Sequence, residues 1–209
     1  LISPGRFIPL AEDSGLIHRL GRHVLAQAAA QAAAWNASRQ TPVTINVNLA
    51  PQEVMQPGLA DEVAAILAEA GCRPEWIKLE LTESALAGDV DWTRRSLQRL
   101  RDLGCALCID DFGTGYSSLS YLHRLPFDCL KIDRSFVLEA RQAGRSRELV
   151  RAIIALADNL GLTVVAEGGE EGAQAELLAG MGCEQAQGFY YAPALAAAEA
   201  AVWLPAGDA

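Results

Sequence analysis

The sequence predicts an α/β fold in which amphipathic helices alternate with short apolar strands, and the strands form a parallel barrel. The chain repeats one unit, made of a helix, a glycine, an apolar strand and a polar residue. Six strand ends of this kind occur about 20 to 36 residues apart, which is typical of βα units. Polar residues at the carboxyl ends of parallel strands converge on one face of a barrel. The six are Asn48, Glu80, Asp110, Lys131, Glu167 and Gln187.

The first half of the chain begins with a loop and a short helix over residues 1–10. An alanine-rich helix is predicted from about Leu16 to Ala37, and a strand from Val43 to Asn48. Apolar residues at helical spacing from Val63 to Ala70 then lead, through a glycine, into a strand from Ile77 to Glu80. Nearly continuous apolar strands indicate a parallel sheet that is buried beneath helices.

The second half shows the unit most clearly between Arg147 and Glu167. The apolar residues of a helix that ends near Leu160 fall on one face, and Gly161 can supply a left-handed cap before the next strand. The strands predicted in this half are Cys105 to Ile109, Cys129 to Lys131, Leu162 to Ala166 and a last one that ends at Gln187.

A complete barrel of this type has eight strands and usually about 250 residues. Six strands are predicted within these 209 residues. We therefore expect a TIM-like (β/α)8 barrel that lacks its first one or two strands, in one N-terminally incomplete domain over residues 1–209. The alternative is a doubly wound open sheet, which would gather its polar groups at one crevice rather than from every strand.

Composition excludes several classes of partner. The formal net charge of −9 argues against a surface that binds DNA, RNA or anionic membranes. The five cysteines lie mostly in apolar segments, so we expect buried, reduced thiols and no disulfide. No apolar run approaches the ~20 residues of a membrane span. We expect a cytoplasmic segment, which in a longer protein can be tethered to a membrane.

Asp110 and Asp111 lie where an apolar strand opens into a glycine-rich loop. Adjacent carboxylates at the edge of a core are costly without a metal or a basic partner, although a turn that begins with Asp is an alternative interpretation. The other strand ends add carboxylate and amide oxygens without His or Cys, which favours Mg²⁺, Mn²⁺ or Ca²⁺ over zinc. Adjacent aspartates can bridge two ions about 3.5–4 Å apart, so the pattern predicts phosphoester hydrolysis.

Lys131 is the single cation among the six strand ends. It could hold the attacking water or a phosphate oxygen, while Glu167 could accept the proton or complete the second metal site. A salt bridge from Lys131 to the aspartates is the structural alternative, and the two roles are compatible.

Seven motifs follow one another in a characteristic order. They are Ser3–Glu12, Ile45–Leu49, Leu79–Ser84, Ile109–Leu119, Leu130–Asp133, Ala166–Glu170 and Gln187–Phe189. Together they resemble the EAL-domain family of bacterial cyclic di-GMP phosphodiesterases, from residue 1 to about Pro193.

This resemblance implies an EAL-type barrel that hydrolyses cyclic di-GMP to linear pGpG with two Mg²⁺ or Mn²⁺ ions, and Ca²⁺ would inhibit it. Lys131 resembles the lysine that positions the hydrolytic water. The implied ligands are Asn48, Glu80 and Asp110 for the first metal, and Asp110, Asp111 and Glu167 for the second.

The resemblance also implies supporting roles around the metals. Glu83 and Glu170 would lie behind the ligands, with Glu83 bracing the following loop, and Asp133 and Gln187 would lie near metal or substrate. A homodimer through the barrel and fusion to upstream sensory or GGDEF-type domains are expected as well. The loop that resembles the link to the dimer interface consists of Phe112, Gly113, Thr114, Gly115, Tyr116, Ser117 and Ser118.

The sequence departs from the family pattern at three places. The Glu-Ala-Leu signature, whose glutamate binds the first metal, is expected upstream of Ser3 and is not among these residues. Gly169 replaces a small apolar residue, and Glu171 stands where Thr is common. A catalytically inactive cyclic di-GMP receptor is therefore the alternative function, and a partner-binding barrel with a silent site is a third. The retained acids and Lys131 favour the hydrolase.

Overall fold

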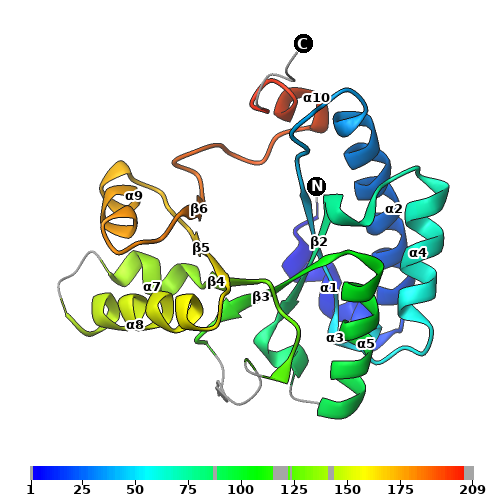
Figure 1. The fold of residues 1–209 in the computed structure, drawn as a ribbon, viewed down its shortest axis with the longest axis horizontal. Coiled ribbons are helices and arrows are strands. Elements are labelled where there is room, and N and C mark those ends of the chain that lie inside the picture. The colour runs from blue at the N-terminus through cyan, green and yellow to red at the C-terminus, as the bar shows by residue number, and fades with distance from the viewer. Residues whose placement is uncertain (1, 87–88, 115–121, 123, 141–143, 205–209) are drawn as a thin grey trace.

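The computed structural model describes residues 2–86, 89–114, 122, 124–140 and 144–204. Its six strands form one sheet in the order β1-β2-β3-β4-β5-β6, and every neighbouring pair is parallel. The sheet curls into part of a barrel, with β1 and β6 at its edges (Figure 1). The strands are β1 Ile45–Asn48, β2 Ile77–Thr82, β3 Ala106–Phe112, β4 Cys129–Ile132, β5 Thr163–Glu167 and β6 Gln185–Gln187.

This order confirms the predicted partial TIM-like barrel. The doubly wound alternative is wrong, because its strand order would reverse at a switch point whereas these strands follow the chain without interruption.

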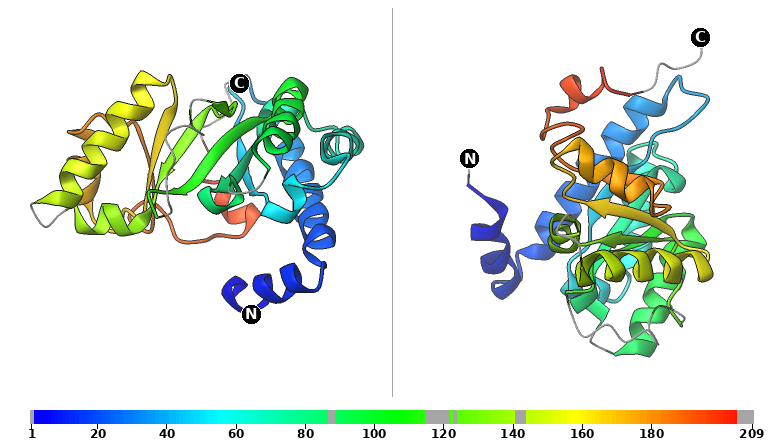
Figure 2. Two further views of the ribbon diagram at one scale, coloured as in Figure 1. Left: turned by 90° about the horizontal axis from the view of Figure 1, so that it is seen from below. Right: turned by 90° about the vertical axis from the view of Figure 1, so that its left-hand side faces the viewer.

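Helices flank the sheet on its outer side. In Figure 1, α2, α4 and α5 lie beside β1 to β3, whereas α7, α8 and α9 lie beside β4 to β6, and Figure 2 shows α1 projecting away from the sheet. The helices are α1 Pro4–Asp13, α2 Ile17–Asn36, α3 Pro51–Val54, α4 Leu59–Glu69, α5 Val90–Leu103, α7 Arg134–Glu139, α8 Arg145–Asn159, α9 Gly172–Ala179 and α10 Ala197–Ala200, with short 3₁₀ turns at Pro74–Trp76 and Glu83–Leu86.

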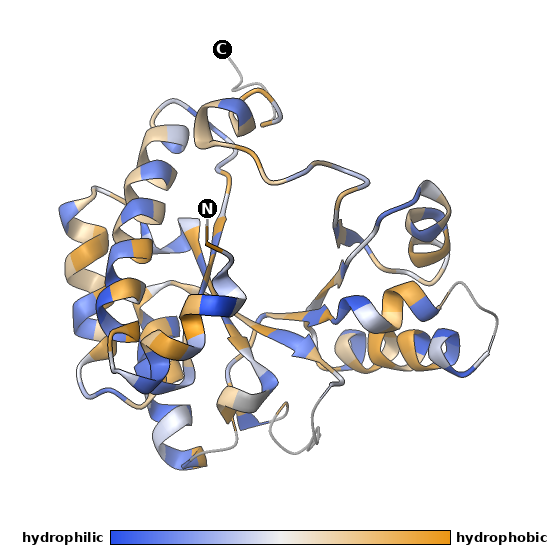
Figure 3. Ribbon diagram, turned by 180° about the vertical axis from the view of Figure 1, so that it is seen from behind, coloured by the Kyte–Doolittle hydropathy of each residue, from blue (hydrophilic) through white to orange (hydrophobic). Residues whose placement is uncertain are grey.

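The two faces of the sheet have different chemistry. Alternate strand residues such as Leu79, Ile109 and Leu130 are buried in the core with residues of the helices, and Figure 3 shows hydrophobic residues concentrated in the strands and on parts of the flanking helices. On the inner face, Cys108 and Cys129 form a separate buried cluster with Val165. Since side chains alternate along a strand, the residues two positions further on also point inward, toward the carboxyl ends of the strands.

Most predicted elements are confirmed. The predicted helix from Leu16 to Ala37 is α2, and Gly161 has the expected left-handed φ of 69° after α8. The predicted first strand was two residues too long, because the side chain of Asn36 donates to Val43 O and accepts from Val43 N, both at 2.8 Å, and holds Val43 outside the sheet.

All five cysteines are buried free thiols, as expected. Among the described residues, no helix combines the length and the apolar character that a bilayer crossing requires.

Candidate active site

A β-bulge brings Asp110 and Asp111 to the same side of β3. Ile109 pairs with Leu130 and Phe112 pairs with Ile132, so the two aspartates together lie opposite Lys131 on β4. Asp111 has a φ of 54° and is the one residue other than glycine with a positive φ in the described chain. Aspartate tolerates this conformation better than most residues. The two acids were predicted to follow the strand, but both lie within it, because the bulge lets β3 continue to pair with its neighbours.

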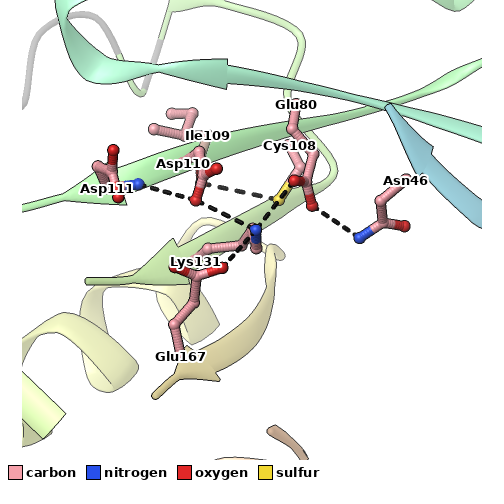
Figure 4. Close-up of polar contacts among 8 residues, drawn as sticks. All are labelled: Asn46, Glu80, Cys108, Ile109, Asp110, Asp111, Lys131 and Glu167. Atoms are coloured by element: carbon pink, nitrogen blue, oxygen red, sulfur yellow. Dashed lines mark hydrogen bonds and ion pairs between the residues drawn. The ribbon is translucent and has the colours of Figure 1, made fainter. Parts of the chain in front are cut away.

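Lys131 lies between three carboxylates, as Figure 4 shows. Its Nζ is 2.9 Å from Glu80 Oε2, 3.2 Å from Asp110 Oδ1 and 2.5 Å from Glu167 Oε1. Only 4% of its side chain is exposed, so these contacts replace its water. The predicted salt bridge between Lys131 and an aspartate is therefore present, and it extends to Glu80 on β2 and to Glu167 on β5.

Asn46 is a polar residue of the site that sequence reasoning missed. Its Nδ2 donates to Glu80 Oε1 at 2.7 Å, so each oxygen of this buried carboxylate has a partner. The predicted ligand Asn48 pairs in register with Glu80 and lies two residues further along β1, hence on the same face. The alternation Asn-Val-Asn was a usable signal, since it directs both amides inward.

The charges of the site do not balance within it. Burial is the largest cause that raises the pKa of Asp111, and the charges of Asp110 and Asp133 add to it. Burial also raises the pKa of Glu167, and the hydrogen bond from Lys131 only partly opposes this effect. For Lys131, burial acts to lower the pKa, but the hydrogen bonds to Glu167 and Glu80 outweigh it and the pKa is raised. The ammonium thus keeps its proton, and an excess of negative charge remains.

The oxygen donors fit a divalent cation. One carboxylate oxygen from each of Asp110, Asp111 and Glu167 lies within 4.8 Å of the others. Oxygen ligands at about 2.0–2.6 Å from an ion can span such separations. An all-oxygen set of this kind suits Mg²⁺, Mn²⁺ or Ca²⁺. These three acids are the set that the resemblance implied for the second metal.

The predicted supporting residues surround this cluster. Glu83 Oε2 accepts a hydrogen bond from the backbone N–H of Gly113 at 3.2 Å, at the start of the predicted loop. Asp133 caps α7 by accepting from the N–H of Ser135 at 2.9 Å. Glu170 forms an ion pair with Arg134. Of the predicted loop, Phe112, Gly113 and Thr114 are described, whereas residues 115–118 lie outside the described part of the chain.

A cleft of about 670 Å³ opens beside Glu167 and is lined by Arg134, Glu170, Gln187 and Phe189 among others. Gln187 pairs in register with Glu167 and lines the same cleft. Gly169, one of the departures from the family pattern, lies between the lining residues Gly168 and Glu170 and makes two backbone hydrogen bonds. Its N–H donates to Gln187 O at 3.2 Å, and its carbonyl accepts from Tyr190 N at 2.9 Å.

Comparisons with known proteins agree with this architecture. The EAL domain family model matches residues 1–194. An uncharacterised protein of Azorhizobium caulinodans is 48% identical over 198 residues, which cover 93% of this chain and 27% of that protein. The cyclic di-GMP phosphodiesterase NbdA of Pseudomonas aeruginosa is 43% identical over 191 residues, which cover 91% of this chain and 24% of that protein. This chain thus spans about a quarter of the length of these relatives.

A solved structure described as the PaMucR phosphodiesterase in complex with c-di-GMP superimposes with a TM-score of 0.91 at 41% identity. The match covers 95% of this chain and 81% of that one. With a family model that spans nearly all of the sequence, the chain belongs to the EAL domain family.

Proposed function

We propose that this domain hydrolyses cyclic di-GMP to linear pGpG with the help of two Mg²⁺ or Mn²⁺ ions. The observation that carries the proposal is the cluster of Asp110, Asp111 and Glu167 oxygens beside the buried ammonium of Lys131. The substrate is inferred from the relative named as a cyclic di-GMP phosphodiesterase and from the PaMucR complex with c-di-GMP.

The excess of negative charge supports the need for metal. Asp110, Asp111 and Glu167 would hold one ion, and Asn48, Glu80 and Asp110 would contribute to the other. Bound divalent ions would lower the pKa of a water molecule and neutralise phosphate oxygens during its attack. Ca²⁺ accepts longer and more variable bonds than Mg²⁺, so we expect it to bind the same oxygens and to inhibit.

Lys131 and Glu167 would have different roles in moving protons. Because its pKa is raised, Lys131 keeps the proton on Nζ and acts as a hydrogen-bond donor to the attacking water or to a phosphate oxygen. Glu167 lies beside Lys131 and the acidic cluster, so it would accept a proton from that water or complete the second metal site.

The cleft beside Glu167 is a suitable place for the dinucleotide. Gln187 and Asp133 would contact substrate or metal near its inner end. Glu83 would hold the turn after β3 through the N–H of Gly113, and Glu170 would support the turn after β5. With these roles, hydrolysis would take place at the carboxyl ends of the strands, where barrels of this type have their active sites.

The test is to incubate the protein, expressed at its full natural length, with cyclic di-GMP and Mg²⁺ and to follow pGpG by chromatography. We expect turnover that stops on chelation, and its near-complete loss in Glu167→Gln, which keeps the shape of the side chain. No pGpG from a protein that binds Mn²⁺ would contradict the proposal. Calorimetric binding of cyclic di-GMP without turnover would support the receptor function instead.

We also propose that the domain forms a homodimer through the barrel and works within a longer signalling protein. The longer protein is supported by the relatives, of which this chain spans about a quarter and one of which is named a bifunctional diguanylate cyclase/cyclic di-GMP phosphodiesterase. The homodimer is inferred from the family resemblance of the loop after β3. Light scattering on the full-length protein tests the dimer. A monomer at every protein concentration tested would contradict the proposed homodimer.

A further inference from the structure

The first turn of α7 lies between the ends of β3 and β5. The turn begins directly after β4, which pairs with β3 on one side and with β5 on the other. Arg134 and Phe136 are two residues apart on this helix, so their side chains point in different directions. Each one contacts a glycine that follows a proposed metal ligand.

Phe136 packs against the turn after Asp111. A β-carbon added at Gly113 would lie 2.7 Å from Phe136 Cε2, so the ring fills the space that a side chain would need. Gly113 has a φ of 100°, and its N–H donates to Glu83. The backbone two residues after Asp111 is thus held by a ring on one side and by a carboxylate on the other.

Arg134 packs in the same way against the turn after Glu167. A β-carbon added at Gly168 would lie 2.8 Å from Arg134 Cβ and 2.9 Å from Arg134 Cδ, and Gly168 has a φ of 76°. The guanidinium continues past this contact to Glu170. The aliphatic part of Arg134 therefore lies against the residue that directly follows Glu167.

We propose that Arg134 and Phe136 are positioning residues, which fix the separation of Asp111 and Glu167 so that both carboxylates can bind one metal ion. The inference rests on the proposed function, because it concerns the same metal site. Neither side chain needs to touch the ion. Each acts by packing against the backbone next to a ligand, and the bulge at Asp111 and the left-handed turn at Gly168 depend on that packing.

The test measures Mn²⁺ affinity by calorimetry on the full-length protein. In Arg134→Ala we expect the dissociation constant to rise by about 10-fold, as is common when a residue that supports a metal ligand is removed. Arg134→Met keeps an aliphatic stem against Gly168 but lacks the charge, so it should bind Mn²⁺ nearly as tightly as the wild type. Arg151→Ala is the matched control, since it removes an exposed arginine that pairs with Glu148 on α8.

Phe136→Ala tests the contact with the turn after β3, at Gly113, and should also raise the dissociation constant for Mn²⁺. Its control is Val137→Ala, which shortens another buried side chain of the same helix. Val137 is 1% exposed and belongs to the hydrophobic core. Thermal unfolding of the metal-free proteins reports general destabilisation. A purely structural role predicts that Val137→Ala and Phe136→Ala weaken Mn²⁺ binding in proportion to their loss of stability.

The outcomes separate this inference from the proposed function. If the wild type binds no Mn²⁺, the proposed function fails and the inference fails with it. If the wild type binds Mn²⁺ and Arg134→Ala binds it equally well, only the inference is overturned. Equal losses in Arg134→Met and Arg134→Ala would overturn it too, because the charge and not the packing would then matter. For the supporting result, kcat at saturating substrate and at a fixed, sub-saturating Mn²⁺ concentration should fall in Arg134→Ala and should be largely restored in Arg134→Met.

Discussion

Asp110 and Asp111 are consecutive residues, yet both lie opposite Lys131 and both offer an oxygen to one cluster. In a regular strand, neighbouring side chains point to opposite faces of the sheet. The bulge and the φ of 54° at Asp111 remove this constraint. The position of the two carboxylates on one side of β3 therefore depends on the backbone conformation at Asp111 as well as on the charges around them.

Replacement of Asp111 by asparagine should separate these two contributions. Asparagine tolerates a positive φ, so the bulge should remain, while the repulsion by Asp110 and Asp133 disappears. We expect the metal-free protein to melt at the same temperature or higher, and turnover to fall by about 100-fold or more. Calorimetric unfolding and a pGpG assay measure the two effects. Asp111→Val is the control, which should lower the melting temperature because a β-branched residue resists this conformation.

Lys131→Met should destabilise the metal-free protein strongly. Removal of the ammonium leaves Glu80, Asp110 and Glu167 without their shared partner, and breaking a buried ion pair typically costs about 3–5 kcal/mol. Because the pKa of Lys131 is raised, its stabilisation is fully present at neutral pH and is lost only above the ordinary lysine pKa. Urea unfolding at pH 7 measures the loss. Arg151→Met, at an exposed pair, should change stability little, and equal effects of the two substitutions would contradict the prediction.

Glu53→Gln should make the protein more stable at neutral pH. Glu53 is 7% exposed, and burial raises its pKa, although the N–H of Ala50 and the charge of His18 oppose the shift and Glu62 adds to it. Because the pKa of Glu53 is raised in the folded state, its favourable contribution to the free energy of unfolding is present below the ordinary glutamate pKa. This contribution is lost as the pH rises through the raised pKa. Glutamine avoids this loss and can still accept from Ala50 N.

The measurement for Glu53→Gln is the melting temperature at pH 7 and at pH 4.5. The gain over the wild type should be larger at pH 7 and should shrink at the lower pH. Glu148→Gln is the control, because it breaks an exposed ion pair with Arg151 and should give no gain. A gain of equal size at both values would show that ionisation of Glu53 is not its cause.

Gly169→Ala should stabilise the protein slightly. A β-carbon at this position would come no closer than 3.8 Å to Tyr191 Cε2, and Gly169 does not have a positive φ. Alanine restricts the unfolded chain, which is worth about 0.4–1 kcal/mol and a rise of roughly 1–4 °C in melting temperature. Gly188→Ala is the opposite case, since its β-carbon would lie 2.5 Å from Gly169 N, and it should melt at a lower temperature. Scanning calorimetry of both variants checks the contrast.

Periodicity in the sequence was sufficient to predict the alternation of helices and strands and the parallel barrel. The spacing of apolar residues in α2 and α8 reflects which side of each helix is buried, and that information is local. The polar residues at strand ends, including Asp110, Lys131 and Glu167, could likewise be predicted to converge, because parallel strands direct their carboxyl ends to one edge.

The exact partners within the site required the tertiary structure. The hydrogen bond from Asn46 to Glu80 depends on the register between β1 and β2, and the contacts of Lys131 join residues that are 21 to 51 positions away from it. The packing of Phe136 on Gly113 and of Arg134 on Gly168 depends on how α7 lies between two turns that are distant in the chain.

The sequence by itself thus determined the fold class, the direction of the strands and the chemical types gathered at one end of the barrel. Only the tertiary structure decided that Asp110 and Asp111 share one side of β3 and that a single ammonium is shared by three carboxylates. The physical reason is that burial patterns are encoded in neighbouring residues, whereas strand register, the bulge and side-chain contacts are set by packing between segments that are far apart in the chain.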